Sequence, residues 1–224
     1  MGRIISDGTP EQERAFVEER RKFAFLAASQ WPLSWIMPAR RHKRAADALY
    51  EIAHNAYERD RERLLAKIKA GSLHRSGSRT LEGQELEDFY DGELLSDYFI
   101  LTGYALECIF KGYLLGILPD LVKDEKRLDK TITTHDLVQL CHDCGMSIST
   151  EEQEVLEFMT LQVVWRKYAG PLRVKDMPSP VDTDDPNTKS LSMHPFHERQ
   201  LQLLVNGIFQ RGFDLLSSLR DQKP

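Results

Sequence analysis

The stretch ELLSDYFILTGYALECIFKGYLLGIL, residues 93–118, decides the fold of this chain. Wound as an α-helix, it is apolar on nearly every side, because its Leu, Ile, Phe and Tyr residues cannot share one stripe. A helix of this kind must be covered by other helices. We therefore expect a helix over residues 84–118, ended by Pro119, at the centre of a helical bundle.

Length and composition favour one large domain. A chain of 224 residues can bury a sizeable core without disulfide bonds. The hydrophobic fraction of 41% and the charged fraction of 29% are typical of a globular protein, and the net charge of -5 gives no general attraction to nucleic acid. Positive charge gathers between residues 40 and 79, where eleven Lys and Arg stand against five Asp and Glu.

The sequence also predicts a cellular location. The N-terminus lacks the basic and then apolar run of a secretory signal, and no window approaches the roughly twenty uninterrupted apolar residues of a membrane span. The three cysteines are odd in number and are not spaced as a disulfide framework, which agrees with a reducing compartment. We expect a cytoplasmic protein with no membrane segment.

The N-terminal part, residues 1–37, is expected to be an accessory helix and a linker. Thr9, Pro10 and Gln12 form a helix start, and the helix should run to about residue 29. Its apolar stripe is narrow, so we expect it to lie against the outside of the bundle. The following WPLSWIMP, residues 31–38, contains two prolines and is expected to break the chain, with its tryptophans filling one end of the core.

The bundle is expected over residues 38–222. Apolar residues recur at three and four positions in several segments, which predicts helices, and no segment alternates as a strand for more than four residues. The expected helices cover residues 38–70, a short piece after Asp136, 149–168 and a last one from Pro195. The stretches 71–84 and 170–193 read as loops. The predicted fold class is therefore all-α, an up-and-down helical bundle around the central helix.

Three stretches, in this order, carry a resemblance to a known family: GYALECIFKGYLL at 103–115, THDL at 134–137 and WRKYAGPL at 165–172. Together they resemble the HEPN domain (higher eukaryotes and prokaryotes nucleotide-binding), in particular a bacterial branch, over about residues 38–220. The resemblance implies a helical bundle that forms a homodimer or binds a nucleotidyltransferase-like partner. It further implies a role in toxin-antitoxin, defence or RNA-processing systems.

Many HEPN proteins are metal-independent ribonucleases, and their signature is an arginine followed, after four to six residues, by a histidine. None of the seven histidines of this chain has an arginine at that distance before it. The nearest approach is Arg127, which has seven residues between it and His135. The chain therefore lacks the usual nuclease signature.

Two charged residues lie four positions apart inside the apolar central stretch. Glu107 precedes Lys111, the spacing and order that let the two side chains meet on one helix face. In one interpretation Lys111 binds a phosphate and Glu107 holds the ammonium in place. In the other, the two form a structural ion pair that lines a seam or a dimer surface.

His135 and Asp136 lie at the start of the short helix. Asp136 is expected to satisfy backbone donors there as a cap. Histidine changes its charge near neutral pH, so His135 is a candidate general base for a ribose 2′-hydroxyl.

Two basic segments are candidate binding sites. Arg166, Tyr168 and Arg173 offer a ring to stack on a base and cations to hold its phosphate, although a solvated helix end explains them equally. The run ARRHKR at 39–44 offers phosphate contacts and is expected at a helix start, where positive charge is unfavourable. This conflict favours a binding role over a solvated face. The candidate residues of the run are Arg40, Arg41, Lys43 and Arg44.

The leading hypothesis is a HEPN-like bundle that binds RNA, a nucleotide or a protein partner. One alternative is a metal-independent endoribonuclease, in which His135 is the base and Arg166 or Arg173 stabilises the phosphorane. A second alternative is a purely structural helical adaptor. No cofactor or metal is expected, because glycine-rich phosphate loops are absent and the segment 141–144 supplies only half a zinc site, so we expect Cys141 to be buried instead.

Overall fold

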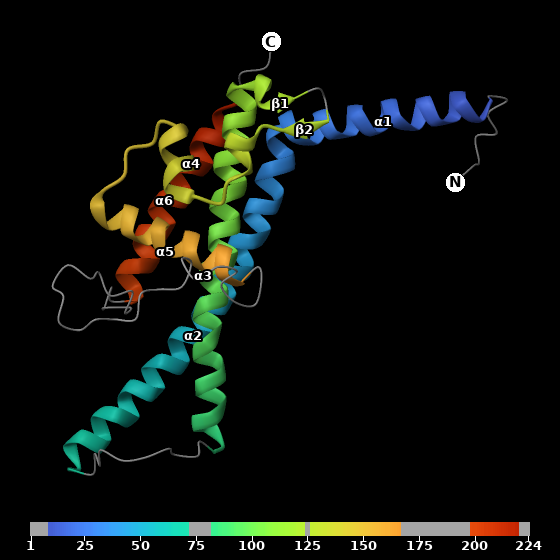
Figure 1. Ribbon diagram of the computed structural model, residues 1–224. Coiled ribbons are helices and arrows are strands. Elements are labelled where there is room, and N and C mark those ends of the chain that lie inside the picture. Colours follow the sequence, from blue (N-terminus) through green and yellow to red (C-terminus); the bar gives the residue numbers. More distant parts are fainter. Residues whose placement is uncertain (1–8, 72–81, 124–125, 167–197, 220–224) are drawn as a thin grey trace.

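The described part of the computed structural model comprises residues 9–71, 82–123, 126–166 and 198–219, without the side chains at 165, 166, 198 and 199. It is almost entirely helical (Figure 1), which confirms the predicted all-α bundle. The six α-helices are α1 (Pro10–Gln30), α2 (Pro32–Lys69), α3 (Gln84–Ile117), α4 (Leu137–Asp143), α5 (Thr150–Arg166) and α6 (Glu198–Ser218).

Helix α3 lies at the centre, as predicted from its apolar sequence. It packs along α2 and against α4, α5 and α6 on its other sides (Figure 1). Its largest fully buried side chains include Phe99, Leu106, Phe110 and Leu115. Because these residues point in different directions around the helix, every side of its C-terminal half requires a partner.

Two glycines of α3 allow its neighbours to come close. A Cβ atom at Gly103 would lie 2.6 Å from Val163 Cγ2 of α5, and one at Gly112 would lie 2.5 Å from Trp35 Cβ of α2. No other residue type fits such spacings without a shift of the neighbouring helix. The Trp35 indole also donates to the backbone oxygen of Ser29 at 2.8 Å. Trp35 therefore fills one end of the core, as expected, whereas Trp31, which was expected there too, is 51% exposed.

The expected break at residues 31–38 is wrong in one respect. Between α1 and α2 the only residue outside a helix is Trp31, because Pro32 already begins α2. Pro38, and the domain boundary that was expected beside it, therefore lie inside α2. A proline there removes one backbone donor. Burial of Ile36 and Ala39 against the bundle supports the first turns of α2 and offsets that loss.

Helix α1 does not lie against the bundle as expected. It projects away from it, and only its C-terminal end makes contact (Figure 1). Ser29 is buried there, whereas Phe16 and Phe23 are 58% and 75% exposed. The apolar stripe of α1 is too narrow to form a second packed seam along the bundle.

The connection between α3 and α4 contains more structure than its charged sequence indicated. It has a 3₁₀ turn, η1 (Pro119–Leu121), a short antiparallel pair of strands, β1 (Val122–Lys123) and β2 (Arg127–Leu128), and a second 3₁₀ turn, η2 (Lys130–Thr133). The second turn anchors the connection, since Ile132 is buried in the core. The chain then enters α4 directly.

By length and composition, α3 could also cross a membrane, and 56% of its most apolar window is buried inside the protein. A buried core helix of a soluble protein passes the same test. Length and composition alone therefore do not distinguish the two.

Candidate functional site

The three candidate residues Glu107, Lys111 and His135 meet at one place. Glu107 Oε1 accepts a hydrogen bond from Lys111 Nζ at 2.7 Å, and Glu107 Oε2 lies 2.9 Å from His135 Nδ1. A single carboxylate therefore links a cation of its own helix to a histidine that is 28 positions away in the sequence. We call these three residues the Glu107 cluster.

The Glu107 cluster lies at the edge of the core. The Lys111 and Glu107 side chains are 9% and 14% exposed, and that of His135 is 30% exposed. Ion pairs in such partly dry surroundings are stronger than pairs in water, but they cost more to desolvate. The carboxylate of Glu107 compensates the charge of Lys111, and the histidine is the member most open to solvent.

Local structure fixes His135 beside α3. Asp136 caps α4 by accepting the backbone N–H of Gln139 at 3.0 Å, which confirms the predicted capping role of Asp136. One residue further on, the backbone N–H of Leu137 donates to Thr160 Oγ1 of α5 at 3.0 Å. These two hydrogen bonds hold the start of α4 between α3 and α5, and so they determine where the imidazole lies.

The contact between Glu107 and His135 has a defined chemical consequence. When Nδ1 carries the proton, it donates to the carboxylate, and Nε2 is then the ring nitrogen with the lone pair. A carboxylate on the first nitrogen orients the ring and stabilises the imidazolium that forms when the second nitrogen takes a proton. The pair is thus arranged as a carboxylate-imidazole dyad.

Two aromatic rings near the Glu107 cluster were not singled out by the sequence analysis. Tyr104 precedes Glu107 by one turn of α3 and is therefore on the same face, and its ring centroid is 5.9 Å from that of His42 of α2. Both residues are partly exposed. The one-turn spacing of Tyr104, Glu107 and Lys111 is a signal that could have revealed this face.

The predicted basic run divides between two environments. The ammonium of Lys43 is buried, pairs with Asp47 and lies 5.7 Å from the Phe209 ring, and the guanidinium of Arg40 lies 4.7 Å from the Phe213 ring. Both therefore face α6. The two ring contacts are part of the packing between α2 and α6.

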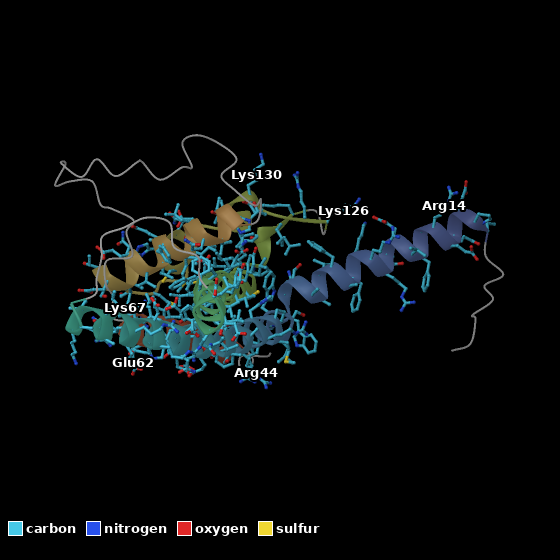
Figure 2. All side chains as sticks on the ribbon, turned by 90° about the horizontal axis from the view of Figure 1, so that it is seen from below. Arg14, Arg44, Glu62, Lys67, Lys126 and Lys130 are labelled. Carbon is cyan, nitrogen blue, oxygen red and sulfur yellow. The ribbon has the colours of Figure 1, made fainter. Side chains whose placement is uncertain are left out.

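Arg41 and Arg44 are exposed, and Figure 2 shows Arg44 on the opposite side of the bundle from Lys130, at the start of the η2 turn. The expectation that the run lies at a helix start is wrong, because α2 begins at Pro32. The run therefore does not oppose the dipole of a helix start, and the argument that this conflict favours a binding role no longer applies. The phosphate contacts expected of the run stay a prediction.

The remaining candidates around residue 170 are not described. Tyr168 and Arg173 lie outside the described residues, and so does the side chain of Arg166, whose backbone ends α5. Their predicted roles stay predictions.

Of the three cysteines, Cys141 and Cys144 are buried and Cys108 is partly buried. Cys141 is buried, as predicted, and burial raises its pKa to about 11. Burial also raises the pKa of Cys144 to about 12, and its Sγ lies 3.5 Å from the backbone oxygen of Phe110. Within the described ranges, no group of three or more His, Cys, Asp or Glu is arranged to hold a metal ion.

Comparisons of the chain with protein-family models, with curated proteins and with solved structures gave no match.

Proposed function

We propose that this protein binds single-stranded RNA, and that the Glu107 cluster holds a phosphate of the bound strand. The observation that carries this proposal is the bridge from Lys111 through Glu107 to His135. The resemblance to HEPN domains supports the choice of ligand class and suggests a toxin-antitoxin or defence setting.

The charge of the Glu107 cluster suits an anion. Lys111 and a protonated His135 together carry two positive charges against the single negative charge of Glu107. The excess positive charge lies next to the apolar core, where the low dielectric strengthens its attraction for a phosphate.

The rings beside the cluster suit a base. Single-stranded nucleic acids bind proteins through phosphate contacts combined with stacking of bases on aromatic side chains, and each stacked base is worth about 1–3 kcal/mol. Tyr104, one turn of α3 before Glu107, offers such a ring, and the ring of His42 lies 5.9 Å from it, centroid to centroid. A nucleotide with its phosphate at the cluster can reach them.

The test compares two histidines of one helical region. Binding of a fluorescent single-stranded RNA is measured by anisotropy for the wild type, for His135→Ala and for His142→Ala, which changes an exposed histidine of α4. We expect His135→Ala to weaken binding about tenfold or more, the loss of one charge-assisted contact. We expect His142→Ala to bind as the wild type does. Equal affinities for all three proteins, or no binding by any, would contradict the proposal.

RNA cleavage is a second candidate function, favoured by the 2.9 Å contact between Glu107 and His135. In this reaction His135 Nε2 takes the proton of a ribose 2′-hydroxyl. The 2′-oxygen attacks the adjacent phosphorus, the bond to the 5′-oxygen breaks, and a 2′,3′-cyclic phosphate and a 5′-hydroxyl form. The 5′-oxygen receives its proton from a general acid, and Arg166 or Arg173 would stabilise the phosphorane.

The two candidates are separated by incubating the pure protein with total RNA in EDTA. Cleavage that is lost in His135→Ala supports the enzyme, and the dyad predicts that Glu107→Gln loses most of it as well. RNA that stays intact but bound supports the binding function alone. RNA that is neither bound nor cut favours a structural adaptor and contradicts both candidates.

A further inference from the structure

The far ends of α2 and α3 form an arm that projects beyond α4, α5 and α6 (Figure 1). We define the arm as residues 57–69 of α2 and residues 84–97 of α3. Its two helices are antiparallel, since the chain leaves the bundle along α2 and returns along α3 (Figure 1). The arm has no part in the Glu107 cluster.

Ion pairs join the two helices of the arm. The side chain of Asp88 is 1% exposed, and its carboxylate accepts from Arg59 Nε at 2.8 Å and lies 2.6 Å from Arg63 Nη1. One turn further on, Lys67 Nζ lies 3.4 Å from Glu85 Oε1. These paired residues mark the side of each helix that faces the other helix.

An exposed apolar residue comes directly after four of these paired residues. The apolar residues are Leu64 and Ile68 of α2 and Leu86 and Phe89 of α3, and they are 48%, 53%, 37% and 53% exposed. One position along a helix is a rotation of about 100°, so all four are turned in the same sense from the side that faces the other helix. Because the helices are antiparallel, this rotation brings all four onto the same face of the arm. We call these four residues the arm face.

The arm face is bordered by carboxylates toward the bundle. Asp60 lies four positions before Leu64, and Glu93 lies four positions after Phe89, so each continues an apolar stripe by one turn. Both are exposed, and Asp60 Oδ1 also lies 3.4 Å from Arg63 Nη2. The surface is thus apolar near the far end of the arm and acidic near the bundle.

The arm as a whole is acidic. Residues 57–97 contain ten Asp and Glu against seven Lys and Arg. In the described part of this range, four of the basic side chains already pair with carboxylates of the arm, namely Arg59, Arg61, Arg63 and Lys67. The surplus negative charge is therefore not neutralised inside the arm, and it favours a partner that carries positive charge.

We infer that the arm binds a basic, amphipathic α-helix of another protein along the arm face. The apolar stripe of such a helix covers the four apolar residues, as amphipathic helices do on apolar surfaces of their partners. Its Lys or Arg residues then meet Asp60 and Glu93. The α2 part of the arm is about 20 Å long, which accommodates a partner helix of about 13 residues. This inference does not rest on the proposed RNA binding.

Fluorescence anisotropy of a labelled peptide tests it with the full chain. The peptide has about 14 residues, with Leu at helical spacings of three and four and Lys elsewhere. We expect it to bind, and we expect the same peptide with Glu in place of Lys to bind at least about tenfold more weakly. A Leu-Lys peptide that does not bind, or a Leu-Glu peptide that binds equally well, would overturn the inference.

Two substitutions test the apolar contacts of the peptide. The double variant Leu64→Ala with Phe89→Ala should bind the Leu-Lys peptide about tenfold or more weakly, because two apolar anchors are lost. The control is Leu203→Ala, which truncates an exposed leucine of α6 and should leave the affinity unchanged. Equal affinities of the two variants would contradict binding at the arm face.

A charge reversal separates the arm face from the opposite face of the arm. One variant carries Asp60→Lys and Glu93→Lys, and the other carries Glu62→Lys and Glu87→Lys. Glu62 and Glu87 come directly before two of the paired residues, so they are turned the other way. All four positions are exposed, so each variant should fold. We expect the first variant to bind the Leu-Lys peptide about tenfold more weakly than the second, although both have the same net charge. Equal binding would mean that only net charge matters and would overturn the inference.

Sedimentation velocity distinguishes a partner helix from a second copy of this chain. We expect the wild type and the variant with Leu64→Ala and Phe89→Ala to sediment alike. If the wild type forms an assembly that these two changes dissociate, a second copy covers the arm face and the inference is overturned.

Discussion

The carboxylate of Glu107 lies 2.9 Å from the imidazole Nδ1 of His135, and its second oxygen holds the ammonium of Lys111 at 2.7 Å. The sequence analysis had considered the α3 pair and the histidine as separate candidates. In the fold they are one cluster, because the η2 turn and the α4 cap bring His135 back to the central helix. Any role of one member therefore involves the other two.

Removing the bridging carboxylate should destabilise the protein moderately. Glu107→Gln leaves Lys111 without its charged partner next to the core, and a partly buried cation that loses its partner costs about 1–3 kcal/mol. Urea denaturation should show this loss. Lys111→Met fills the same space without a charge, so it should cost less than Glu107→Gln. If Lys111→Met instead unfolds the protein strongly, the lysine has a structural role and not a ligand-binding one.

Asp88 of α3, whose carboxylate pairs with Arg59 and Arg63 of α2, should make stability depend on pH in acid. Hydrogen bonds from Arg59, Gln84 and Arg63 lower the pKa of Asp88 from 3.8 to about 2. A carboxyl whose pKa is depressed on folding stabilises the protein fully above its unfolded pKa, and this contribution is lost as pH falls toward the folded value. The melting temperature of the wild type should therefore fall more steeply than that of Asp88→Asn between pH 4 and pH 2. Parallel curves for the two proteins would contradict this prediction.

The close contact between α3 and Trp35 should not tolerate a larger residue. Gly112→Ala places a methyl group 2.5 Å from Trp35 Cβ, and overpacking of this kind costs about 1–3 kcal/mol. The matched control is Gly207→Ala in α6, where a Cβ meets nothing within 4 Å. That change should stabilise the protein by up to about 1 kcal/mol, since alanine favours a helix more than glycine does. Calorimetry measures the stability of both variants. Equal effects of the two changes on stability would contradict this prediction and would show that α2 can move away from α3.

The three thiols, two buried and one partly buried, should be unreactive in the folded protein. Burial raises the pKa values of Cys108 and Cys141 to about 11 and that of Cys144 to about 12. Only the thiolate attacks a disulfide reagent, so labelling at pH 8 should be slow and should become complete in denaturant. Fast labelling of the native protein would mean that at least one of these thiols opens to solvent.

The central helix and most helix ends could be predicted from the sequence, because their signals are local. The apolar run of α3 is read from neighbouring residues, and the capping pair Thr9 with Gln12 lies within one turn. Pro38 was misjudged because tertiary packing of α2 outweighs the local cost of a proline. The apolar stripe of α1 was read as an outer contact with the bundle, but it is too narrow to hold the helix there.

The site was only partly predictable for the same reason. Glu107, Lys111 and His135 were all singled out, but their meeting joins residues that are far apart in the sequence. The pairing of Asp88 with Arg59 and Arg63 was missed entirely. Its arginines and its aspartate look like ordinary surface charges until α2 and α3 are aligned, and only that alignment shows that the carboxylate is buried.

The proposal that the Glu107 cluster binds RNA is tested most directly by NMR of the histidine imidazole signals during titration with a single-stranded RNA. We predict that the His135 signals shift in proportion to bound RNA and that those of His142, exposed on α4, do not. If RNA binds and the His135 signals stay unchanged at saturation, or if both histidines respond equally, the Glu107 cluster is not the binding site.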